Sequence, residues 1–384
     1  MRHQNIVFHS LLKHVPWGRF DQLVDEHQAD KHVRSLTTKS QLIALIYGQL
    51  SGASSLREIE AALISHSTKL YHLGAETVAR ATLSDANAQR SWQVFGGLFA
   101  ALVGQVQRGL RRKTAEALHL IDATGIRLSA QSKGWAKFSS GVCGAKVHVI
   151  YDPDAECPIY AAVTPANVND ITVAKQMPIT AGATYVFDLG YYDYGWWAAL
   201  DAAGCRIVTR LKVNTPISVV VERHLISGSN ILSDRIGHLP QRMARNRSNP
   251  LQRPVREVCV RIETGTVLRI LTNDLDAPAS QIADLYKRRW QIELFFRWVK
   301  QALKIKHFLG RSENAVRIQI AVALITFLLL RMAHAAQRTV QSLLGFARLV
   351  RANLMHKRPI ARLLDPPRPI QQNLRQISLD LCKN

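Results

Sequence analysis

Three β-rich runs decide the fold: Ala117-Leu-His-Leu-Ile-Asp122, Gly144-Ala-Lys-Val-His-Val-Ile-Tyr151 and Pro158-Ile-Tyr-Ala-Ala-Val-Thr164. Each run is bounded by Gly, Pro, Asp or Asn, the residues that end strands, so three consecutive strands are predicted. A helical segment follows from Asp170, then a strand at residues 184–188, a helix at 196–203 and a strand at 205–210. Such an order predicts a mixed-sheet α/β core.

The other segments of the chain have different patterns of apolar residues. Residues 1–110 carry short apolar stripes of helical period, such as the capped start at Ser54–Leu63, and predict a small helical bundle. Residues 213–278 hold Val- and Ile-rich pieces and predict a β insertion. A long helix is expected from Ala279 to His307, with further helices at 313–337 and 339–356.

The composition excludes several classes of protein. The chain has 384 residues, and its 50 Lys and Arg against 28 Asp and Glu give a net charge of +22. A chain of this length buries a large core, which argues against disorder and against a disulfide-stapled miniprotein. The charge favours a polyanionic partner, because each Lys or Arg set against a phosphate releases counterions.

Compartment signals point to a reduced, non-membrane protein. The five cysteines are scattered and form no Cys-x-x-Cys pair, so we expect free thiols and no zinc site. The first residues lack the apolar run of a signal peptide. The longest apolar stretch, Ile320–Leu330, is about half the ~20 residues that cross a bilayer, so a buried helix is predicted. We therefore expect a cytoplasmic protein with no membrane partner.

Two acidic residues, Asp122 and Asp188, each end an apolar β run. A carboxylate at the end of a core strand is held rigidly beside solvent, where a metal ligand suits; a turn or helix cap is the alternative for either alone. Carboxylate oxygens suit Mg²⁺ or Mn²⁺, and a pair on neighbouring strands can share two ions, the arrangement that serves phosphodiester cleavage.

A third candidate lies in the predicted helix from Ala279. Tyr286, Arg289, Glu293 and Lys300 fall on one stripe at 3.6 residues per turn. Apolar residues occupy the adjoining face. A solvated face of ion pairs, with Glu293 held by Arg289 and Arg297, explains the stripe equally well.

These residues resemble the DDE transposases of bacterial insertion sequences. The branch with a Tyr-(2)-Arg-(3)-Glu-(6)-Lys signature is matched by the stripe just described. Asp122-Ala-Thr-Gly resembles the first-Asp motif, and Asp188-Leu-Gly-Tyr-Tyr-Asp-Tyr resembles the second. Ser51-Gly-Ala-Ser-Ser-Leu-Arg-Glu-Ile resembles the N-terminal domain of one group in this branch, so the resemblance covers most of residues 35–310.

The resemblance implies a fold and a chemistry. The core would be RNase H-like, with Asp122, Asp188 and Glu293 holding two Mg²⁺ ions, for which Mn²⁺ substitutes. The enzyme would bind the terminal inverted repeats of an insertion sequence, cleave the DNA ends by two-metal hydrolysis, and join the 3′-OH ends to target DNA by cut-and-paste. Synapsis of two ends implies a homodimer, and the resemblance implies a bacterial, nucleoid-associated protein.

The resemblance also implies DNA contacts. Tyr286, Arg289 and Lys300 would hold phosphates near a hairpin end, since relatives form a hairpin intermediate. Those relatives stack a flipped base on an aromatic of the β insertion, yet residues 213–278 contain no Phe, Tyr or Trp. Trp290 matches the second aromatic of that arrangement, with core packing as its alternative role. Base capture by His238 or Met243 is a further hypothesis.

Other polar residues give weaker signals. His119 and His148 lie near the proposed site, but on strands they more often face the core. Asn169 and Asp170 suit a helix start or a supporting role, and Lys133 and Lys146 suit phosphate contacts.

The predicted domains carry very unequal charge. They are a helical N-terminal domain (1–110) for DNA-end binding, a catalytic core (111–212 and 279–310), the β insertion (213–278) and basic C-terminal helices (311–384) for DNA binding or dimerisation. In the first, Ala81–Arg90 predicts a DNA-facing helix, with Ser84 as cap and Asn87 and Arg90 exposed; an ordinary helical bundle without DNA contact is the alternative. Residues 279–384 alone hold 19 Lys and Arg against 5 Asp and Glu, so DNA is expected there, with Lys304, Lys306 and Arg311 as contacts.

Two other functions remain open from the sequence. A non-catalytic DNA-binding regulator would use the helical region and the basic surface without needing the three carboxylates. An RNase H-like DNA nuclease would need all three but would not join a cleaved end to a second duplex.

Overall fold

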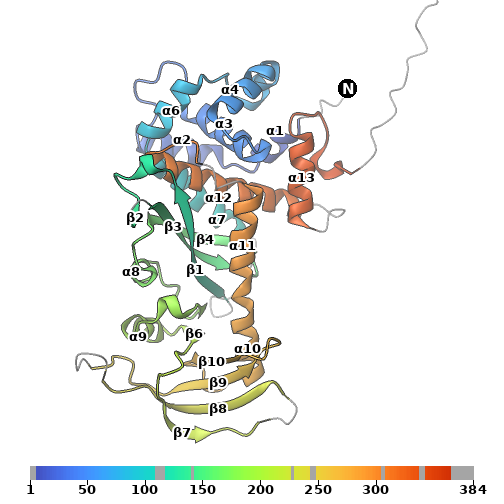
Figure 1. The fold of residues 1–384 in the computed structure, drawn as a ribbon. Coiled ribbons are helices and arrows are strands. Elements are labelled where there is room, and N and C mark those ends of the chain that lie inside the picture. Colours follow the sequence, from blue (N-terminus) through green and yellow to red (C-terminus); the bar gives the residue numbers. More distant parts are fainter. Residues whose placement is uncertain are drawn as a thin grey trace, which may run out of the picture.

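The computed structural model describes residues 6–108, 117–139, 142–225, 229–242, 248–303, 308–336 and 342–364. Figure 1 shows three levels: helices from the N-terminal region with α12 and α13 at one end, a sheet in the middle, and the strands β7 to β10 at the other end. The helices α10 and α11 run along one side of the sheet and connect the two ends (Figure 1).

The central strands are β1 (Leu118–Leu128), β3 (Val142–Asp152), β4 (Cys157–Pro165), β5 (Thr184–Val186) and β6 (Arg206–Arg210), with a short β2 (Lys137–Ser139) beside β3. They lie in the order β4-β3-β1-β5-β6. The first three are antiparallel, while β5 is parallel to β1 and β6 is parallel to β5. This is the RNase H-like order, and it confirms the mixed-sheet α/β prediction. The expected helices of this region are α8 (Asp170–Ala174) and α9 (Tyr194–Ala202).

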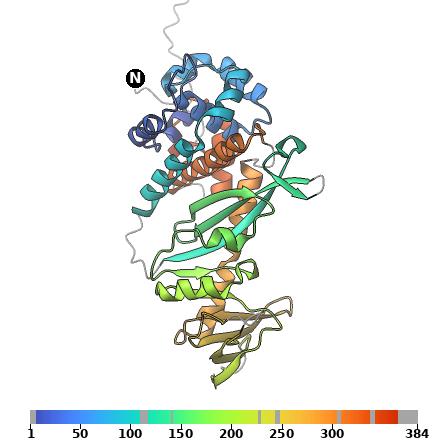
Figure 2. The ribbon, with the colours of Figure 1, turned by 90° about the vertical axis from the view of Figure 1, so that its left-hand side faces the viewer.

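Residues 213–278 extend the same sheet. They supply β7 (Ser218–Glu222), β8 (Ile231–His238), β9 (Val255–Arg261) and β10 (Val267–Thr272). Antiparallel pairing of β10 with β6 joins these strands to the core, so the described strands form one continuous sheet. Figure 2 shows this end projecting away from the helices. The β insertion was predicted, but β8 was not among the expected strands, and the sequence did not reveal that the strands continue the core sheet.

The N-terminal region is helical, as predicted. Its α-helices are α1 (Val7–Leu12), α2 (Trp17–Glu26), α3 (Thr38–Ser51), α4 (Leu56–Ser65), α5 (Ser67–Leu70), α6 (Arg80–Gln89) and α7 (Trp92–Arg108). The capped start is confirmed: Ser55 Oγ accepts a hydrogen bond from the Glu58 amide, and Glu58 accepts one from the amide of Ser54.

One detail of this region was predicted wrongly. Ser84 lies inside α6 and does not cap it. Asn87 is buried and its Oδ1 accepts a hydrogen bond from Gln41 Nε2 at 2.8 Å. Arg90 is directed inward as well, where Nη1 donates to Gln41 Oε1 at 3.0 Å. Buried polar groups need partners, and Asn87 and Arg90 supply them between α3 and α6, so neither faces DNA as expected.

The long helix expected at 279–307 is divided. The structure has α10 (Ala279–Arg288) and α11 (Trp290–Ala302), and residues 304–307 lie outside the described part. At the junction the hydrogen bonds shorten to an i→i−3 pattern, from the Arg289 amide to the Tyr286 carbonyl and from the Ile292 amide to the Arg289 carbonyl. Arg289 therefore sits at a tightened turn between two helices.

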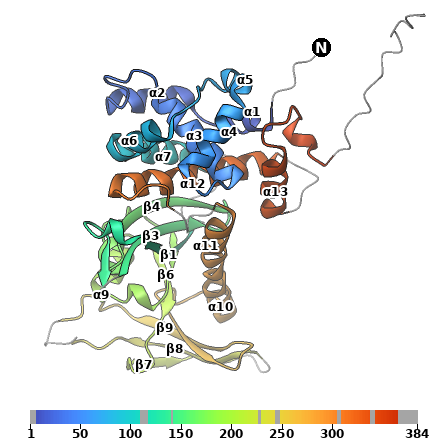
Figure 3. The same ribbon diagram turned by 45° about the horizontal axis from the view of Figure 1, so that its top comes forward.

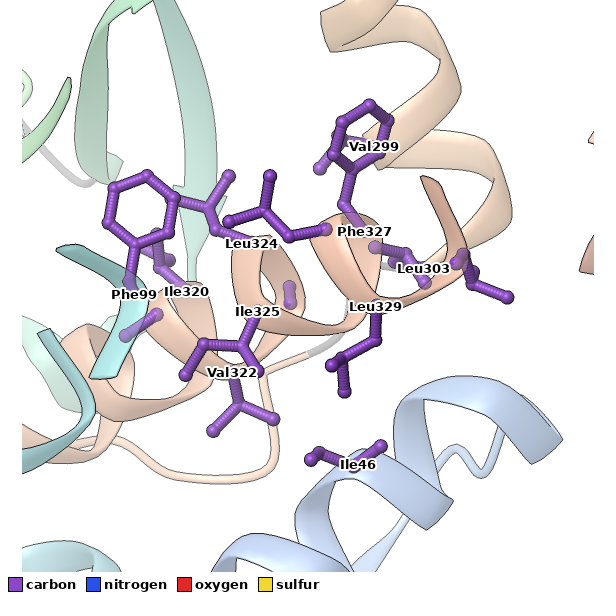
Figure 4. Packing of buried hydrophobic residues seen from close by; sticks show 14 of the residues in the cluster. Ile46, Phe99, Val299, Leu303, Ile320, Val322, Leu324, Ile325, Phe327 and Leu329 are labelled. Carbon is purple, nitrogen blue, oxygen red and sulfur yellow. The ribbon is translucent and has the colours of Figure 1, made fainter. Parts of the chain in front are cut away.

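The helix α12 (Glu313–Ala335) is the core of the helical level, and α13 (Leu343–Asn353) packs against it. Figure 4 shows its apolar side chains surrounded by Phe99 of α7, Ile46 of α3 and Val299 of α11. It is long and apolar enough to span a membrane, but 83% of its most apolar window is buried inside the protein. The prediction of a buried helix at Ile320–Leu330 is confirmed, since every residue of that stretch is buried.

Candidate active site

The two strand-end aspartates are placed side by side by strand register. Leu120 of β1 pairs with Val186 of β5 in parallel, and Asp122 and Asp188 each follow two residues later. The strand period of two puts both carboxylates on the face of the sheet that carries Leu120 and Val186. That face packs against the helical core, whereas the residues of opposite parity join a second core beneath α8 and α9.

The helix α11 brings Glu293 to the same face. Thr124 and Ile126 of β1 lie with Phe296 and Val299 of α11 around one small apolar cavity, which shows how the helix crosses the strand. Glu293 stands one turn before this contact. Its charge is close enough to raise the pKa of Asp122.

Arg289 lies among these carboxylates. Its Nη2 is 2.6 Å from Glu293 Oε1, and its Nη1 is 3.7 Å from Asp122 Oδ2. The guanidinium carbon also lies 5.9 Å from the ring centre of Tyr286, which is buried. Three of the four residues of the predicted stripe are therefore in contact. Burial raises the pKa of the Tyr286 hydroxyl, so this group stays protonated.

The environment of Asp122 disfavours the ionised form of its carboxyl. Its pKa is raised to about 6, chiefly because it is buried, and also because Asp188 and Glu293 are negative; the Ala123 amide and Arg289 act in the opposite direction. Three carboxylates that repel one another are the type of oxygen ligand that a hard divalent cation such as Mg²⁺ prefers. In the described residues, however, no group of three His, Cys, Asp or Glu side chains is gathered closely enough to hold a metal ion.

The other residues predicted to contact DNA have different environments. Trp290 is 50% exposed, which excludes core packing as its role. Lys300 lines the small cavity with Thr124 and Phe296. Arg311 is exposed, and its carbonyl accepts hydrogen bonds from Ser132 and Trp135. Lys304, Lys306 and Met243 lie outside the described residues, and His238 Nδ1 is 3.2 Å from the Gln252 carbonyl.

The strand histidines face the other side of the sheet. His119 packs edge-on against Tyr185, and His148 is fully buried with its pKa lowered to about 4 by desolvation. Asp170 Oδ1 lies 2.9 Å from Lys146 Nζ and 3.7 Å from His148 Nδ1. Because their positions have the parity opposite to Asp122, the histidines do not face its carboxylate.

Sequence reasoning missed that Tyr191 lies near the candidate site. This tyrosine is 1% exposed, and its hydroxyl has no hydrogen-bond partner among the described residues. Burial and the charges of Asp122, Asp170 and Asp188 raise its pKa, so the neutral hydroxyl lies near all three carboxylates. A Cβ on Gly190 would lie 3.0 Å from Asp188 Oδ1 and 3.5 Å from Asp170 Oδ2, so glycine gives these two carboxylates room. The Asp188-Leu-Gly-Tyr spacing was the available signal.

Comparison with known proteins identifies the family. Residues 114–329 match the family described as transposase DDE domain, and residues 3–76 match a domain of unknown function (DUF4372). The chain is 43% identical over 285 residues to a putative transposase, y4zB, of Sinorhizobium fredii, covering 74% of this chain and 80% of the relative. It is 28% identical over 257 residues to a probable transposase for insertion sequence element IS5377 of Geobacillus stearothermophilus, covering 66% and 67%.

A solved structure shows a more distant likeness. The cryo-EM structure of piggyBac transposase synaptic complex with hairpin DNA aligns with a TM-score of 0.42 and 12% identity, over 94% of this chain and 81% of that one. The family match covers more than half of the chain. The chain therefore belongs to the DDE transposase family, whose members are enzymes that act on DNA and generally use divalent metal ions.

Proposed function

We propose that this chain is a cut-and-paste transposase of an insertion sequence, with Asp122, Asp188 and Glu293 as its metal-holding triad. The observation that carries the proposal is that these three carboxylates lie on one face of the sheet: strand register places the two aspartates side by side, and the charges of Asp188 and Glu293 both raise the pKa of Asp122. Family membership alone does not assign these residues; their placement supports the assignment.

The chain's own residues would position the DNA. Phosphoryl transfer gives a protein little covalent chemistry, so positioning and charge neutralisation supply most of the acceleration. Divalent cations, Mg²⁺ or Mn²⁺ and two per site, would activate water and offset phosphate charge when bound by the triad. Arg289 is able to make a bidentate phosphate contact, and Lys300 supplies a point charge. The buried Tyr286 hydroxyl beside Arg289 is a neutral donor for the same phosphate.

The exposed indole of Trp290 would support an unstacked base at the cleaved end. It lies next to Arg289, with the Arg297 guanidinium 6.0 Å from its ring centre. Aromatic faces stack bases without regard to sequence. We propose that Trp290 takes the role for which residues 213–278 offer no aromatic side chain, in a branch with the Tyr-Arg-Glu-Lys signature.

The assembly and location follow from this role. Joining two ends requires them to be held together, so we propose a homodimer in the synaptic complex, acting on double-stranded DNA in the bacterial cytoplasm. The basic C-terminal region, including Arg311, would contribute to DNA affinity.

The test is cleavage of a DNA fragment that carries the inverted repeats flanking this gene, with Mg²⁺ or Mn²⁺. Wild-type protein should nick at the repeat ends, and Asp188→Asn should abolish the product. Asp284→Asn is the matched control, since Asp284 is exposed on α10 and outside the triad. Absence of cleavage by wild type, or cleavage that survives Asp188→Asn, would refute the assignment. Cleavage without joining to a second duplex would favour a nuclease, and repeat binding without any cleavage would favour a regulator.

A further inference from the structure

Helix α6 forms a polar ridge on the surface of the N-terminal region. Its buried side, with Leu83, Ala86 and Asn87, packs against the rest of the helices. The rest of the helix, seven of its ten residues, is exposed: Arg80, Ala81, Thr82, Ser84, Asp85, Ala88 and Gln89. Figure 3 shows α6 at one edge of the helical level, away from α13. At 100° per residue these exposed positions span about half of the helix circumference, so the ridge projects from the surface.

One side of this ridge borders a polar groove of about 770 Å³, here called the α4 groove. Its walls are the start of α4, the face of α6 with Arg80 and Ser84, and the segment 308–312 that leads into α12. Arg57, Arg80 and Arg311 line it, and all three are exposed. None of the three forms an ion pair with another residue in the part of the chain that is described.

The other side borders a second polar groove of about 610 Å³, here called the loop groove. It lies between α6 and the segment 27–36, and Thr82 and Gln89 of α6 face it. Lys31 and Arg34 are its exposed cations. Asp85 lines both grooves, which places it on the crest of the ridge and makes it the acidic residue common to both linings.

A ridge between two cationic grooves is complementary to duplex DNA. The major groove is about 12 Å wide and admits one α-helix, with a phosphate backbone on each side. Small side chains at Ala81, Ser84 and Ala88 allow the helix to approach the bases closely. The exposed arginines of the two grooves, Arg34 on one side and Arg57, Arg80 and Arg311 on the other, lie where the two backbones would pass.

We infer that α6 is the recognition helix that reads the terminal inverted repeat in the major groove, with the α4 groove and the loop groove each holding one phosphate backbone. This inference rests on the proposed function and names the surface by which the ends are recognised. It places DNA on α6 as the sequence suggested, but through Ser84, Asp85 and Gln89 and not through the buried Asn87 and Arg90.

The exposed side chains of α6 indicate which base edges the helix can recognise. Gln89 is able to form two hydrogen bonds with an adenine edge, and the Asp85 carboxylate accepts from the amino group of cytosine. Ser84 donates or accepts, and the methyl groups of Ala81 and Ala88 suit thymine methyl groups. Contacts of the groove cations with phosphate carry no sequence information.

Base contacts from α6 and phosphate contacts from the groove cations can be tested separately by fluorescence anisotropy. The probes are a labelled duplex with the terminal inverted repeat and a scrambled duplex of equal length, each titrated across a range of salt concentrations. Full-length Ser84→Ala/Gln89→Ala, which keeps the net charge, should reduce the preference for the repeat about 5- to 100-fold and leave the salt slope unchanged. Arg34→Gln/Arg57→Gln, one from each groove, should weaken both duplexes equally and reduce the salt slope by about 2.

Matched controls use exposed residues far from α6. Arg253→Gln/Arg261→Gln in the β insertion removes the same charge, and Gln107→Ala on α7 shortens an exposed amide. The Ser84/Gln89 variant keeping the full preference, or the control arginines flattening the slope as much as Arg34 and Arg57, would overturn the inference while repeat cleavage by wild type still stood. If wild type neither prefers nor cleaves the repeat, the proposed function fails as well.

Discussion

Arg289 and Glu293 form an ion pair of 2.6 Å at the turn where α10 meets α11, and the same guanidinium reaches Asp122 at 3.7 Å. The pair is mostly buried, with 17% of the Arg289 side chain and 31% of the Glu293 side chain exposed. One arginine thus compensates two carboxylates of the candidate triad. Its Nε is buried and has no hydrogen-bond partner among the described residues.

Arg289→Gln should raise the pKa of Asp122 above its value of about 6. Arg289 is among the groups that lower that pKa, so removing its charge favours the protonated carboxyl. A pH titration of the Asp122 side-chain carboxyl by NMR would measure the change. Arg289→Lys, which keeps the charge, should shift it less, and Arg297→Gln on the exposed side of α11 should leave it unchanged. A pKa that falls in Arg289→Gln would contradict this account.

Asp122→Asn should stabilise the protein at pH 8. The pKa of Asp122 is about 6 in the folded protein and 3.8 for an ordinary aspartate. Above pH 6 the ionised carboxyl therefore lowers the free energy of unfolding by about 3 kcal/mol. The cost falls as the pH drops through 6 and is absent below 3.8, where both states are protonated. Urea unfolding at pH 8 and pH 4 would test this, with Asp284→Asn as the neutral control. Destabilisation by Asp122→Asn at pH 8 would show that the carboxylate is held by favourable contacts.

Residue pattern predicted the parts of this site that depend on local sequence. Asp122 and Asp188 were found because each ends a buried strand, and the helical spacing of Tyr286, Arg289 and Glu293 put them on one stripe. The break at Arg289 was not predicted, since no Gly or Pro marks it and the change is only a tightening of hydrogen bonds.

The features that the sequence did not predict depend on contacts between residues far apart in the chain. Asn87 and Arg90 are polar residues that pattern assigns to the surface, yet their partner Gln41 lies more than 45 positions away. The continuation of the sheet from β6 to β10 likewise depends on pairing between strands separated by the whole of β7 to β9. Tyr191 reads as an ordinary aromatic until the fold places it near three carboxylates.

Phe327→Ala should destabilise the protein by about 3–5 kcal/mol, because it removes a large buried side chain from the centre of α12. The ring contacts Phe295 and Trp298 edge-on, each at a centroid distance of 5.0 Å, so it links α12 to α11. Chemical unfolding followed by circular dichroism would measure the loss. Ile64→Ala, at a side chain that is 56% exposed, should cost less than about 0.5 kcal/mol. Equal effects of the two changes would argue against α12 as the core.

Trp290→Ala should separate catalysis from folding. Because the indole is half exposed, its loss should change the free energy of unfolding by less than about 1 kcal/mol. If it stacks an unpaired base, truncation removes about 1–3 kcal/mol of stacking and lowers the yield of covalently closed hairpin ends about 5- to 100-fold. Denaturing gels of cleaved repeat ends would measure that yield. Leu294→Ala, a 44% exposed neighbour on α11, is the matched control and should leave it unchanged. A hairpin trapped in equal yield with Trp290→Ala would exclude the indole from base capture.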